Sequence, residues 1–248
     1  MKADPALQRR LLDLQAVDTR LDQIAHARAT LPQLKDIALL KAKGEDLDLD
    51  LAAAKAAVSD VQREVEKAEA DVQLVRDRAA RNQARLDAGT GTAKDLQALQ
   101  HELESLGRRQ SELEDEELEV MERAEELASR AAVLEASRAD LTGSLTELEQ
   151  ARDAALGTLA AEEQQVQERR AGIAPELPDD LVALYEKVRR SSGGVGAAEL
   201  TQRRCGGCRL ELNQVDLNRI AGAAADDVVR CEECGRIMVR TAESGLPA

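Results

Sequence analysis

The chain has 248 residues, of which 33% are charged, and its formal net charge is −14. With one tyrosine and no phenylalanine or tryptophan, the composition excludes an ordinary globular core and has the Ala, Leu, Glu, Arg and Asp bias of long helices. The acidic balance argues against a nucleic-acid groove along these helices.

The first predicted element is an amphipathic helix that is interrupted near Pro32. Its apolar stripe contains Leu7, Leu14, Val17, Leu21, Ile24 and Leu31. A proline inside a helix removes one hydrogen bond and clashes with the carbonyl four residues earlier, and the stripe also changes phase here, so we expect a kink near residue 32. The N-terminal residues carry no apolar signal core, and no apolar stretch approaches the length of a membrane span. We therefore expect a cytoplasmic protein without a membrane partner.

Two long helices follow, each with mostly apolar residues at alternating steps of three and four. The second of these seams keeps its phase from Leu96 to Ile173. The first contains Leu47, Leu51, Ala54, Val58, Val61, Val65, Ala68, Val72, Val75, Ala79, Asn82 and Leu86. This 3.5-residue repeat is typical of a left-handed coiled coil. A short link with two glycines, at residues 87–93, predicts antiparallel neighbours, with Ala68 opposite Leu113 and Gly44 about opposite Arg138.

Polar residues in the seam and at the tip leave two interpretations open. The polar seam positions are Asn82, Gln110, Glu117, Arg138, Arg152, Glu162 and Arg169. They either fix the register, with long side chains reaching water, or mark a widened segment that grips a partner. Thr92 can cap the helix after the link, with Asp95 near its positive end. These caps either prevent fraying only, or support a docking site with Lys94 and His101 on its rim.

A proline-containing linker at residues 174–178 ends the coiled coil. A short helix, capped by Asp179 or Asp180, then carries an apolar face with Tyr185 on it. Tyr185 is expected to pack at the junction between the coiled coil and the tail. A Ser-Ser-Gly-Gly break at residues 191–194 separates this helix from the tail.

Two Cys-x-x-Cys pairs, Cys205 with Cys208 and Cys231 with Cys234, are separated by 22 residues. Such a pair forms a tight turn that points two thiolates at one ion, and Gly207 and Gly235 would permit the turns. Four protein sulfurs leave no position for water or substrate, so the spacing predicts one structural Zn²⁺. A redox dithiol is the alternative, but no thioredoxin-like βαβ pattern accompanies the cysteines.

The segment around the cysteines is predicted to be rich in short strands and in arginine. Strands are predicted at residues 209–212, 228–230 and 237–240, and Asn213 is predicted to cap a helix that runs through Ile220. Residues 201–240 contain seven arginines and six acids, a local charge of about +1 against about −15 for the remainder. Arginine binds phosphate or carboxylate in a bidentate way, so nucleic acid or an acidic protein face would suit. No aromatic residue is available there for base stacking.

These motifs resemble a bacterial family of four-cysteine zinc-ribbon proteins with an N-terminal coiled-coil hairpin. The resemblance is carried by Cys205-Gly206-Gly207-Cys208, by Cys231-Glu232-Glu233-Cys234-Gly235-Arg236-Ile237-Met238 and by the hairpin-tip segment at residues 92–106. It covers nearly the whole chain. It implies a non-enzymatic role in protein scaffolding or in RNA or DNA binding and, in some relatives, links to flagellar or secretion machinery.

We therefore expect a mainly α protein with a long antiparallel coiled-coil hairpin over residues 1–173, a linker and short helix over 174–192, and a small β-rich zinc ribbon over 193–248. The expected function is that of a cytoplasmic adaptor that binds a protein partner; the alternative is an RNA- or DNA-binding regulator acting through the ribbon. No nucleophile–base pair, open metal site or cofactor loop is visible, so neither enzymatic activity nor a small-molecule substrate is expected. The oligomeric state is left open. The candidate partner-binding residues are Arg203, Arg204, Arg209, Arg230, Arg236 and Lys94.

Overall fold

The computed structural model describes residues 1–246, and contacts divide the chain into two units. One unit comprises residues 35–149, and the other joins residues 1–34 to those from 150 onward. The sequence-based division at residues 173 and 192 follows the chain, whereas the contacts group the first helix with the tail. Each unit has its own buried residues.

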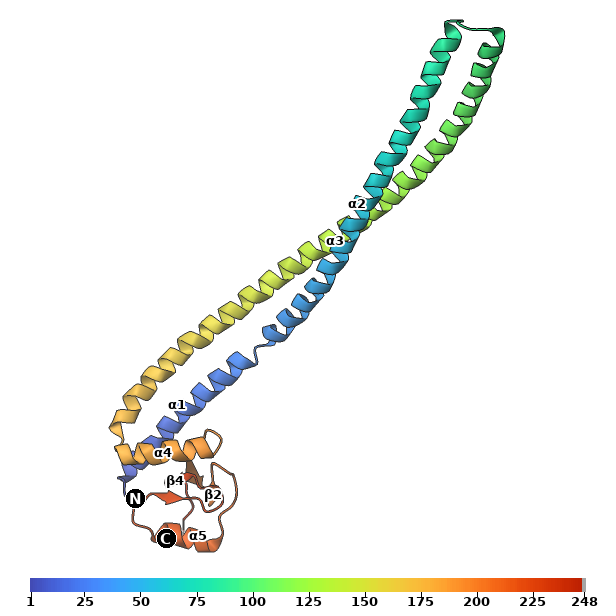
Figure 1. Ribbon diagram of the computed structural model, residues 1–248. Coiled ribbons are helices and arrows are strands. Elements are labelled where there is room, and N and C mark those ends of the chain that lie inside the picture. The colour runs from blue at the N-terminus through green and yellow to red at the C-terminus, as the bar shows by residue number, and fades with distance from the viewer. Residues whose placement is uncertain (247–248) are drawn as a thin grey trace. The chain divides into compact units, whose positions relative to one another are not determined.

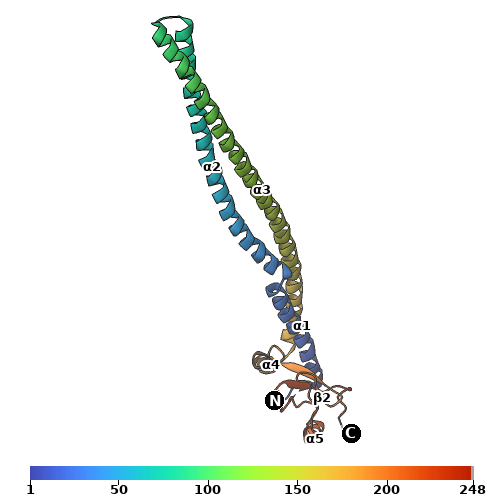
Figure 2. The ribbon, with the colours of Figure 1, turned by 90° about the vertical axis from the view of Figure 1, so that its right-hand side faces the viewer.

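Residues 35–149 form the predicted antiparallel hairpin (Figures 1 and 2). Its two helices belong to α2 (Pro32–Asp87) and α3 (Ala93–Ile173), which both continue into the other unit. The buried residues of α2 are Ile37, Gly44, Ala54, Val61, Val65, Val72 and Asn82. All of them lie on the predicted 3-4 seam or its upstream continuation. The periodicity of the sequence therefore identified the face that each helix buries.

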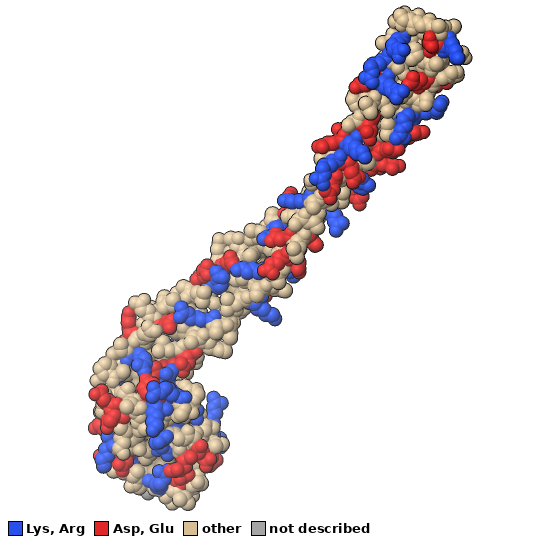
Figure 3. Space-filling model, in the orientation of Figure 1, with Lys and Arg blue, Asp and Glu red and all other residues tan. Residues whose placement is uncertain are grey.

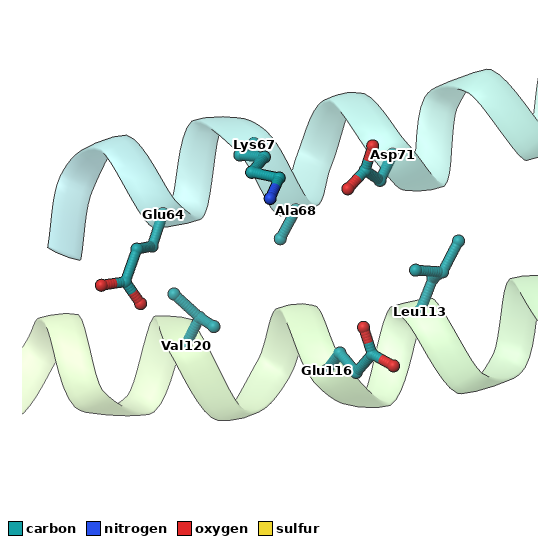
Figure 4. A pocket seen from close by; sticks show the side chains of 7 residues that line it. All are labelled: Glu64, Lys67, Ala68, Asp71, Leu113, Glu116 and Val120. Atoms are coloured by element: carbon teal, nitrogen blue, oxygen red, sulfur yellow. The ribbon is translucent and has the colours of Figure 1, made fainter.

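Small residues of α2 face larger ones of α3 across this seam. A Cβ atom added to Gly44 would lie 3.4 Å from Leu141 and 3.9 Å from Arg138, which places Gly44 beside its predicted neighbour. Figure 4 shows Ala68 facing α3, where Leu113 and Val120 line the same cavity of about 200 Å³. Alternating small and large side chains allow the two helices to approach evenly.

The tip of the hairpin is closed by glycine backbone geometry and by reciprocal capping. Gly89 and Gly91 have φ angles of +61° and +137°, which residues with a side chain rarely adopt. The Thr92 hydroxyl accepts a hydrogen bond from the Asp95 N–H at 3.3 Å, and the Asp95 carboxylate accepts one from the Thr92 N–H at 2.9 Å. This arrangement is a capping box, so the predicted Thr92 cap is confirmed.

In the other unit, α1 (Pro5–Ala29) precedes a two-residue break before α2. Thr30 ends α1 by donating both its N–H and its hydroxyl to the carbonyl of His26, at 3.0 and 2.8 Å. Pro32 then occupies the first turn of α2, where its missing N–H costs no helical hydrogen bond. The expected kink is thus a clean interruption between two helices.

A short 3₁₀ turn, η1 (Ala174–Glu176), and α4 (Asp179–Ser191) follow α3. The prediction that Asp179 or Asp180 caps α4 is wrong, because Pro178 is the N-cap and no side chain caps this end. The two aspartates instead lie in the first turn of α4, where their charge favours the positive end of the helix dipole.

A four-stranded sheet with the order β2-β1-β4-β3 completes this unit. The strands are β1 (Ala197–Thr201), β2 (Arg204–Cys205), β3 (Val229–Arg230) and β4 (Ile237–Val239), and α5 (Gln214–Gly222) lies between β2 and β3 in the chain. The strands β1 and β4 are parallel, and each pairs with its outer neighbour in the antiparallel sense. Asn213 caps α5 as predicted, because its side chain accepts the Asp216 N–H at 2.8 Å. The N-terminus joins this unit as well: the Ala3 N–H donates to the Asp226 carbonyl at 2.7 Å.

The prediction of a strand at residues 209–212 is wrong. Arg209 has a φ angle of +65°, so the backbone turns there, and only Glu211 forms an isolated bridge. The structure has a strand that was not predicted, β1, and this strand pairs with β4.

A buried polar cluster joins α1 to α3 and α4. The Asp18 carboxylate is 1% exposed and accepts hydrogen bonds from the Tyr185 hydroxyl at 2.7 Å and from Arg170 Nε at 2.6 Å. Gln15 accepts a second bond from the Tyr185 hydroxyl at 3.2 Å. Burial raises the pKa of Tyr185, and the hydrogen bond to Asp18 raises it further. Tyr185 is therefore a packing residue with a fixed hydroxyl donor, at the junction where packing was expected.

Candidate metal centre

The two cysteine pairs form turns with the same backbone hydrogen bond. The Arg209 N–H donates to the Cys205 carbonyl at 2.7 Å, and the Gly235 N–H donates to the Cys231 carbonyl at 2.8 Å. In each pair the residue after the second cysteine therefore closes the turn. Because the two turns share this hydrogen bond, each pair of thiols is oriented in the same way relative to its own backbone.

A second hydrogen bond repeats in both turns. The Cys205 N–H donates to the Leu210 carbonyl at 3.1 Å, and the Cys231 N–H donates to the Arg236 carbonyl at 2.9 Å. In each case the acceptor lies five residues after the first cysteine. The two segments are thus duplicate knuckles that differ in sequence outside their cysteines.

The glycines of the two knuckles have different roles. Gly235 adopts a φ angle of +71°, as the turn requires, but its counterpart in the first knuckle is Arg209 and not Gly207. Gly207 is needed for space instead, because a Cβ atom there would lie 2.4 Å from Cδ of Arg236. The prediction that Gly207 permits the turn through its backbone freedom is therefore wrong.

The four sulfur atoms have the spacing of a tetrahedral zinc site. The Sγ atoms of Cys205 and Cys234 are 3.8 Å apart, those of Cys208 and Cys231 are 3.9 Å apart, and all four lie within 4.8 Å of one another. Zinc–sulfur bonds of about 2.3 Å in a tetrahedron place the sulfurs about 3.8 Å apart. The residues present fit one Zn²⁺, with every ligand supplied by the protein.

The site is part of the ribbon core, which shapes the acidity of its thiols. Cys205 and Cys231 are buried together with Leu200 and Met238. Burial raises the pKa of Cys205 and raises the pKa of Cys231 to about 12. Burial opposes ionisation of Cys234 too, but hydrogen bonds from Arg236 and the neighbouring thiols lower its pKa to about 7. A bound Zn²⁺ would favour the ionised form of all four thiols, because a coordinated sulfur is a thiolate.

Several of the arginines singled out in the sequence bind the backbone of their own chain. Arg236 donates to the carbonyls of Ser192 at 2.5 Å and Val195 at 3.1 Å, which ties the second knuckle to the loop before β1. Arg230 Nε donates to the Gly235 carbonyl at 2.7 Å. Arg203 Nε donates to the Gly245 carbonyl at 3.1 Å, and Arg203 itself has a φ angle of +64°.

Two arginines and two apolar side chains are exposed within residues 204–215, the segment that contains the first knuckle and the start of α5. Arg204 forms an ion pair with Glu211 at 3.4 Å, and Arg209 makes no side-chain hydrogen bond or ion pair within residues 1–246. Leu210 is 51% exposed and Val215, in the first turn of α5, is 77% exposed. We call Arg204, Arg209, Leu210 and Val215 the ribbon face.

Arg240 has a structural role that the sequence did not indicate. Its guanidinium donates to the carbonyls of Ile220, Ala223, Ala224, Ala225 and Asp227, at 2.7 to 3.3 Å. These carbonyls lie at and beyond the C-terminal end of α5, where a helix leaves its acceptors without partners. The nearness of Arg240 to the cysteines in sequence gave no hint of this contact.

The remaining candidate, Lys94, lies far from the cysteines in sequence, in the first turn of α3 at the hairpin tip. Its side chain is exposed, as is that of His101. Within the part of the chain that the structure describes, Lys94 forms no ion pair.

None of the helices among the described residues is long and apolar enough to cross a membrane.

Comparisons with known proteins agree with this architecture. Residues 14–193 match the CT398-like coiled coil hairpin domain, and residues 204–238 match the C4-type zinc ribbon domain. The uncharacterized protein Rv2229c of Mycobacterium tuberculosis is 40% identical over 244 residues, which cover 97% of this chain and 98% of that protein.

Solved structures show the same fold. A structure from Mycobacterium smegmatis has 42% identity and a TM-score of 0.84, with 97% of this chain and all of that chain covered. The CT398 structure from Chlamydia trachomatis has 16% identity and a TM-score of 0.65, with 95% and 98% covered, and so shows the fold alone. The chain therefore belongs to the family of CT398-like coiled-coil hairpin proteins and carries the C4-type zinc ribbon at its C-terminal end.

Proposed function

We propose that this protein is a non-enzymatic adaptor, in which the zinc ribbon recognises a protein partner and the coiled-coil hairpin sets distance and offers a second surface. The observation that carries this proposal is the composition of the ribbon face. Two exposed apolar side chains, Leu210 and Val215, accompany Arg209, an arginine that has no hydrogen-bond or ion-pair partner for its side chain among residues 1–246. Apolar contact area and an arginine are typical of protein interfaces, so the partner would present an acidic surface with apolar side chains.

The non-enzymatic part of the proposal is supported by the closed metal site. A catalytic zinc keeps one position for water or substrate, whereas here four cysteine sulfurs supply the whole tetrahedral shell. The zinc would stabilise the ribbon rather than polarise a substrate. Hydrolytic activity that required this zinc would contradict the proposal.

The alternative is an RNA- or DNA-binding regulator, and the arginine content of the ribbon favours it. Binding to phosphates requires several cations that are available together. Arg203, Arg230 and Arg236 each use part of their guanidinium on carbonyls of their own chain. These contacts leave fewer guanidinium groups available to bind phosphates, so protein binding is favoured over nucleic-acid binding.

Affinity capture with the full chain tests the protein-binding function. Two variants of the ribbon face, Arg209→Glu and Val215→Asp, are compared with Lys94→Glu at the tip and with the control Lys43→Glu, which reverses an exposed charge on α2. We expect the two ribbon variants to lose a partner that the wild type and Lys43→Glu retain, with unchanged helicity and zinc content. If Lys94→Glu alone loses the partner, recognition lies at the tip. If all four variants retain every captured protein, neither surface recognises a partner.

Fluorescence anisotropy with a labelled RNA and a labelled DNA duplex tests the alternative. The adaptor function predicts no saturable binding to either probe near physiological salt. Saturable, salt-dependent binding that Arg209→Glu weakens and Lys43→Glu does not would favour the nucleic-acid function instead.

A further inference from the structure

The hairpin of residues 35–149 carries opposite charges in separate places. Residues 78–101, around the tip, contain four basic and two acidic residues, whereas residues 112–126 of α3 contain nine acids and one arginine. Figure 3 shows blue atoms near the free end of the hairpin, and many red atoms, with blue ones among them, on the adjoining part of it. Some of the charges within these two segments that form no ion pair among the described residues are arranged in stripes.

The basic stripe lies on α2 and ends at the tip. Leu74, Arg78, Arg81 and Arg85 follow one another at steps of four, three and four, which places them on one side of the helix. All four are exposed, and the exposed fraction of Leu74 is 65%. Arg78 forms an ion pair with Glu102 at 2.5 Å, but Arg81 and Arg85 form none among the described residues.

The acidic stripe lies on α3 and has the same spacing. Asp115, Glu119, Glu122 and Glu126 also follow at steps of four, three and four, and each is exposed. Within residues 1–246 none of these four carboxylates forms an ion pair. Leu118, 58% exposed, lies on the same side of the helix, so both stripes combine charge with an exposed leucine.

We propose that the basic stripe of one chain binds the acidic stripe of a second copy. When α2 of one copy lies parallel to α3 of the other, Arg78, Arg81 and Arg85 come opposite Glu119, Glu122 and Glu126. Leu74 then lies within one helical turn of Leu118 of the second copy. Because α2 runs toward the tip and α3 away from it, the two hairpins lie antiparallel. The tip region of each copy then lies beside the hairpin of the other. A two-fold axis repeats the contact, since each copy carries both stripes.

The second copy is favoured over another partner because this chain itself supplies the complement. The 4-3-4 spacing matches, and three of the four positions bring opposite charges together, whereas at the first position Leu74 comes opposite Asp115. Each stripe also has an exposed leucine near its first charged residue. Individual exposed ion pairs contribute little, so the association depends on the whole set and weakens as salt screens it.

Analytical ultracentrifugation of the full chain tests this inference. We expect concentration-dependent dimers at about 50 mM salt and an apparent Kd at least about tenfold higher at about 500 mM, where the screening length is shorter. A wild-type chain that stays monomeric at low salt up to the highest soluble concentration would overturn the proposal.

Charge reversal identifies the contact. The variant Arg81→Glu/Arg85→Glu and the variant Glu122→Arg/Glu126→Arg should each weaken the homodimer, and the two variants should associate when mixed. The chain that carries all four substitutions should dimerise again, because the reversed charges are again complementary. The control Lys35→Glu/Lys43→Glu changes the net charge as the first variant does, but lies outside the stripes. Dimers that persist in the first variant, or that the fourfold variant fails to restore, would show that the stripes do not pair.

Discussion

The four cysteine thiols make zinc binding dependent on pH. Burial raises the pKa of Cys205 and raises that of Cys231 to about 12, so both thiols carry protons at neutral pH when no metal is bound. Zinc must displace these protons, and lowering the pH therefore weakens its binding. At least these two protons are released, and Cys234, whose pKa is about 7, also becomes protonated toward the acidic end of the range. We therefore expect the apparent affinity to fall by at least about 100-fold per pH unit between about pH 8 and pH 6. Competition with a chelator of known affinity at each pH measures this slope.

The stoichiometry gives a separate check on the same residues. Native mass spectrometry should show one zinc per wild-type chain and loss of stoichiometric zinc in Cys231→Ser, because three thiols leave the tetrahedral shell incomplete. Protein purified without chelator that contains no metal would contradict the zinc assignment. An affinity that does not change with pH would show that the thiols are already ionised in the metal-free protein.

The Tyr185 hydroxyl is a second residue with a measurable contribution. It donates to the buried carboxylate of Asp18, which keeps Arg170 as its other donor. Tyr185→Phe should therefore lower the free energy of unfolding by about 1–3 kcal/mol without changing the fold. Urea denaturation followed by circular dichroism measures the loss.

Ser191→Ala is the matched control for Tyr185→Phe, because among the described residues the Ser191 hydroxyl donates only to carbonyls of its own helix, α4. Loss of the Ser191 hydroxyl should change the free energy of unfolding by less than about 0.5 kcal/mol. Equal unfolding midpoints for the two variants would mean that the buried cluster around Asp18 contributes nothing to stability.

At the scale of the elements, the hairpin depends on its seam rather than on its surface charges. Leu113 is 7% exposed, whereas the Glu112 side chain next to it is 63% exposed and forms an ion pair with Arg109. Leu113→Asp places an unpaired carboxylate between the helices and should cost at least about 3 kcal/mol. Glu112→Ala should change stability by less than about 0.5 kcal/mol. Thermal melts followed by circular dichroism compare the two, and equal shifts would mean that the assigned seam is wrong.

The elements that the sequence predicted are those fixed by local patterns. The 3-4 repeat identifies the buried face of α2 because each turn of a coiled coil repeats the same environment. The paired cysteines likewise predict a zinc site, since the spacing within each pair is set by one short turn. Thr92 and Asn213 were recognised as caps because a cap depends on residues only three positions away.

The elements that the sequence did not predict depend on distant contacts. The strand β1 begins with two alanines, which have low strand propensity, and it is a strand because Ala197 pairs with Ile237. Arg209 takes the left-handed backbone conformation that the glycine after Cys234 adopts in the second knuckle, although arginine does not favour it. The cluster around Asp18 joins residues more than 150 positions apart. No local pattern carries that information.

For the whole molecule, the two units differ in their dependence on the metal. The ribbon has a small core that includes the ligands Cys205 and Cys231, whereas the hairpin of residues 35–149 contains no cysteine. Small domains of this kind take much of their folding free energy from zinc, on the order of 10 kcal/mol or more. The N-terminal residues share this dependence, because Val228 donates its N–H to the Met1 carbonyl at 3.1 Å and Lys2 forms an ion pair with Asp226 at 3.0 Å.

Removal of zinc should therefore loosen one unit and leave the other intact. After chelation we expect the backbone amides of Leu200 and Met238, in β1 and β4, to exchange with deuterium much faster. The amide of Ala3, which donates to the Asp226 carbonyl, should do the same. The amides of Val61 and Val72 should keep their protection, because the seam that buries them contains no metal ligand. Hydrogen–deuterium exchange with mass spectrometry resolves these segments, circular dichroism should retain most of the helical signal, and added zinc should restore the original pattern. Equal loss of protection in the ribbon and in the hairpin seam would show that the metal stabilises the whole chain, and unchanged protection in the ribbon would show that the zinc is not structural.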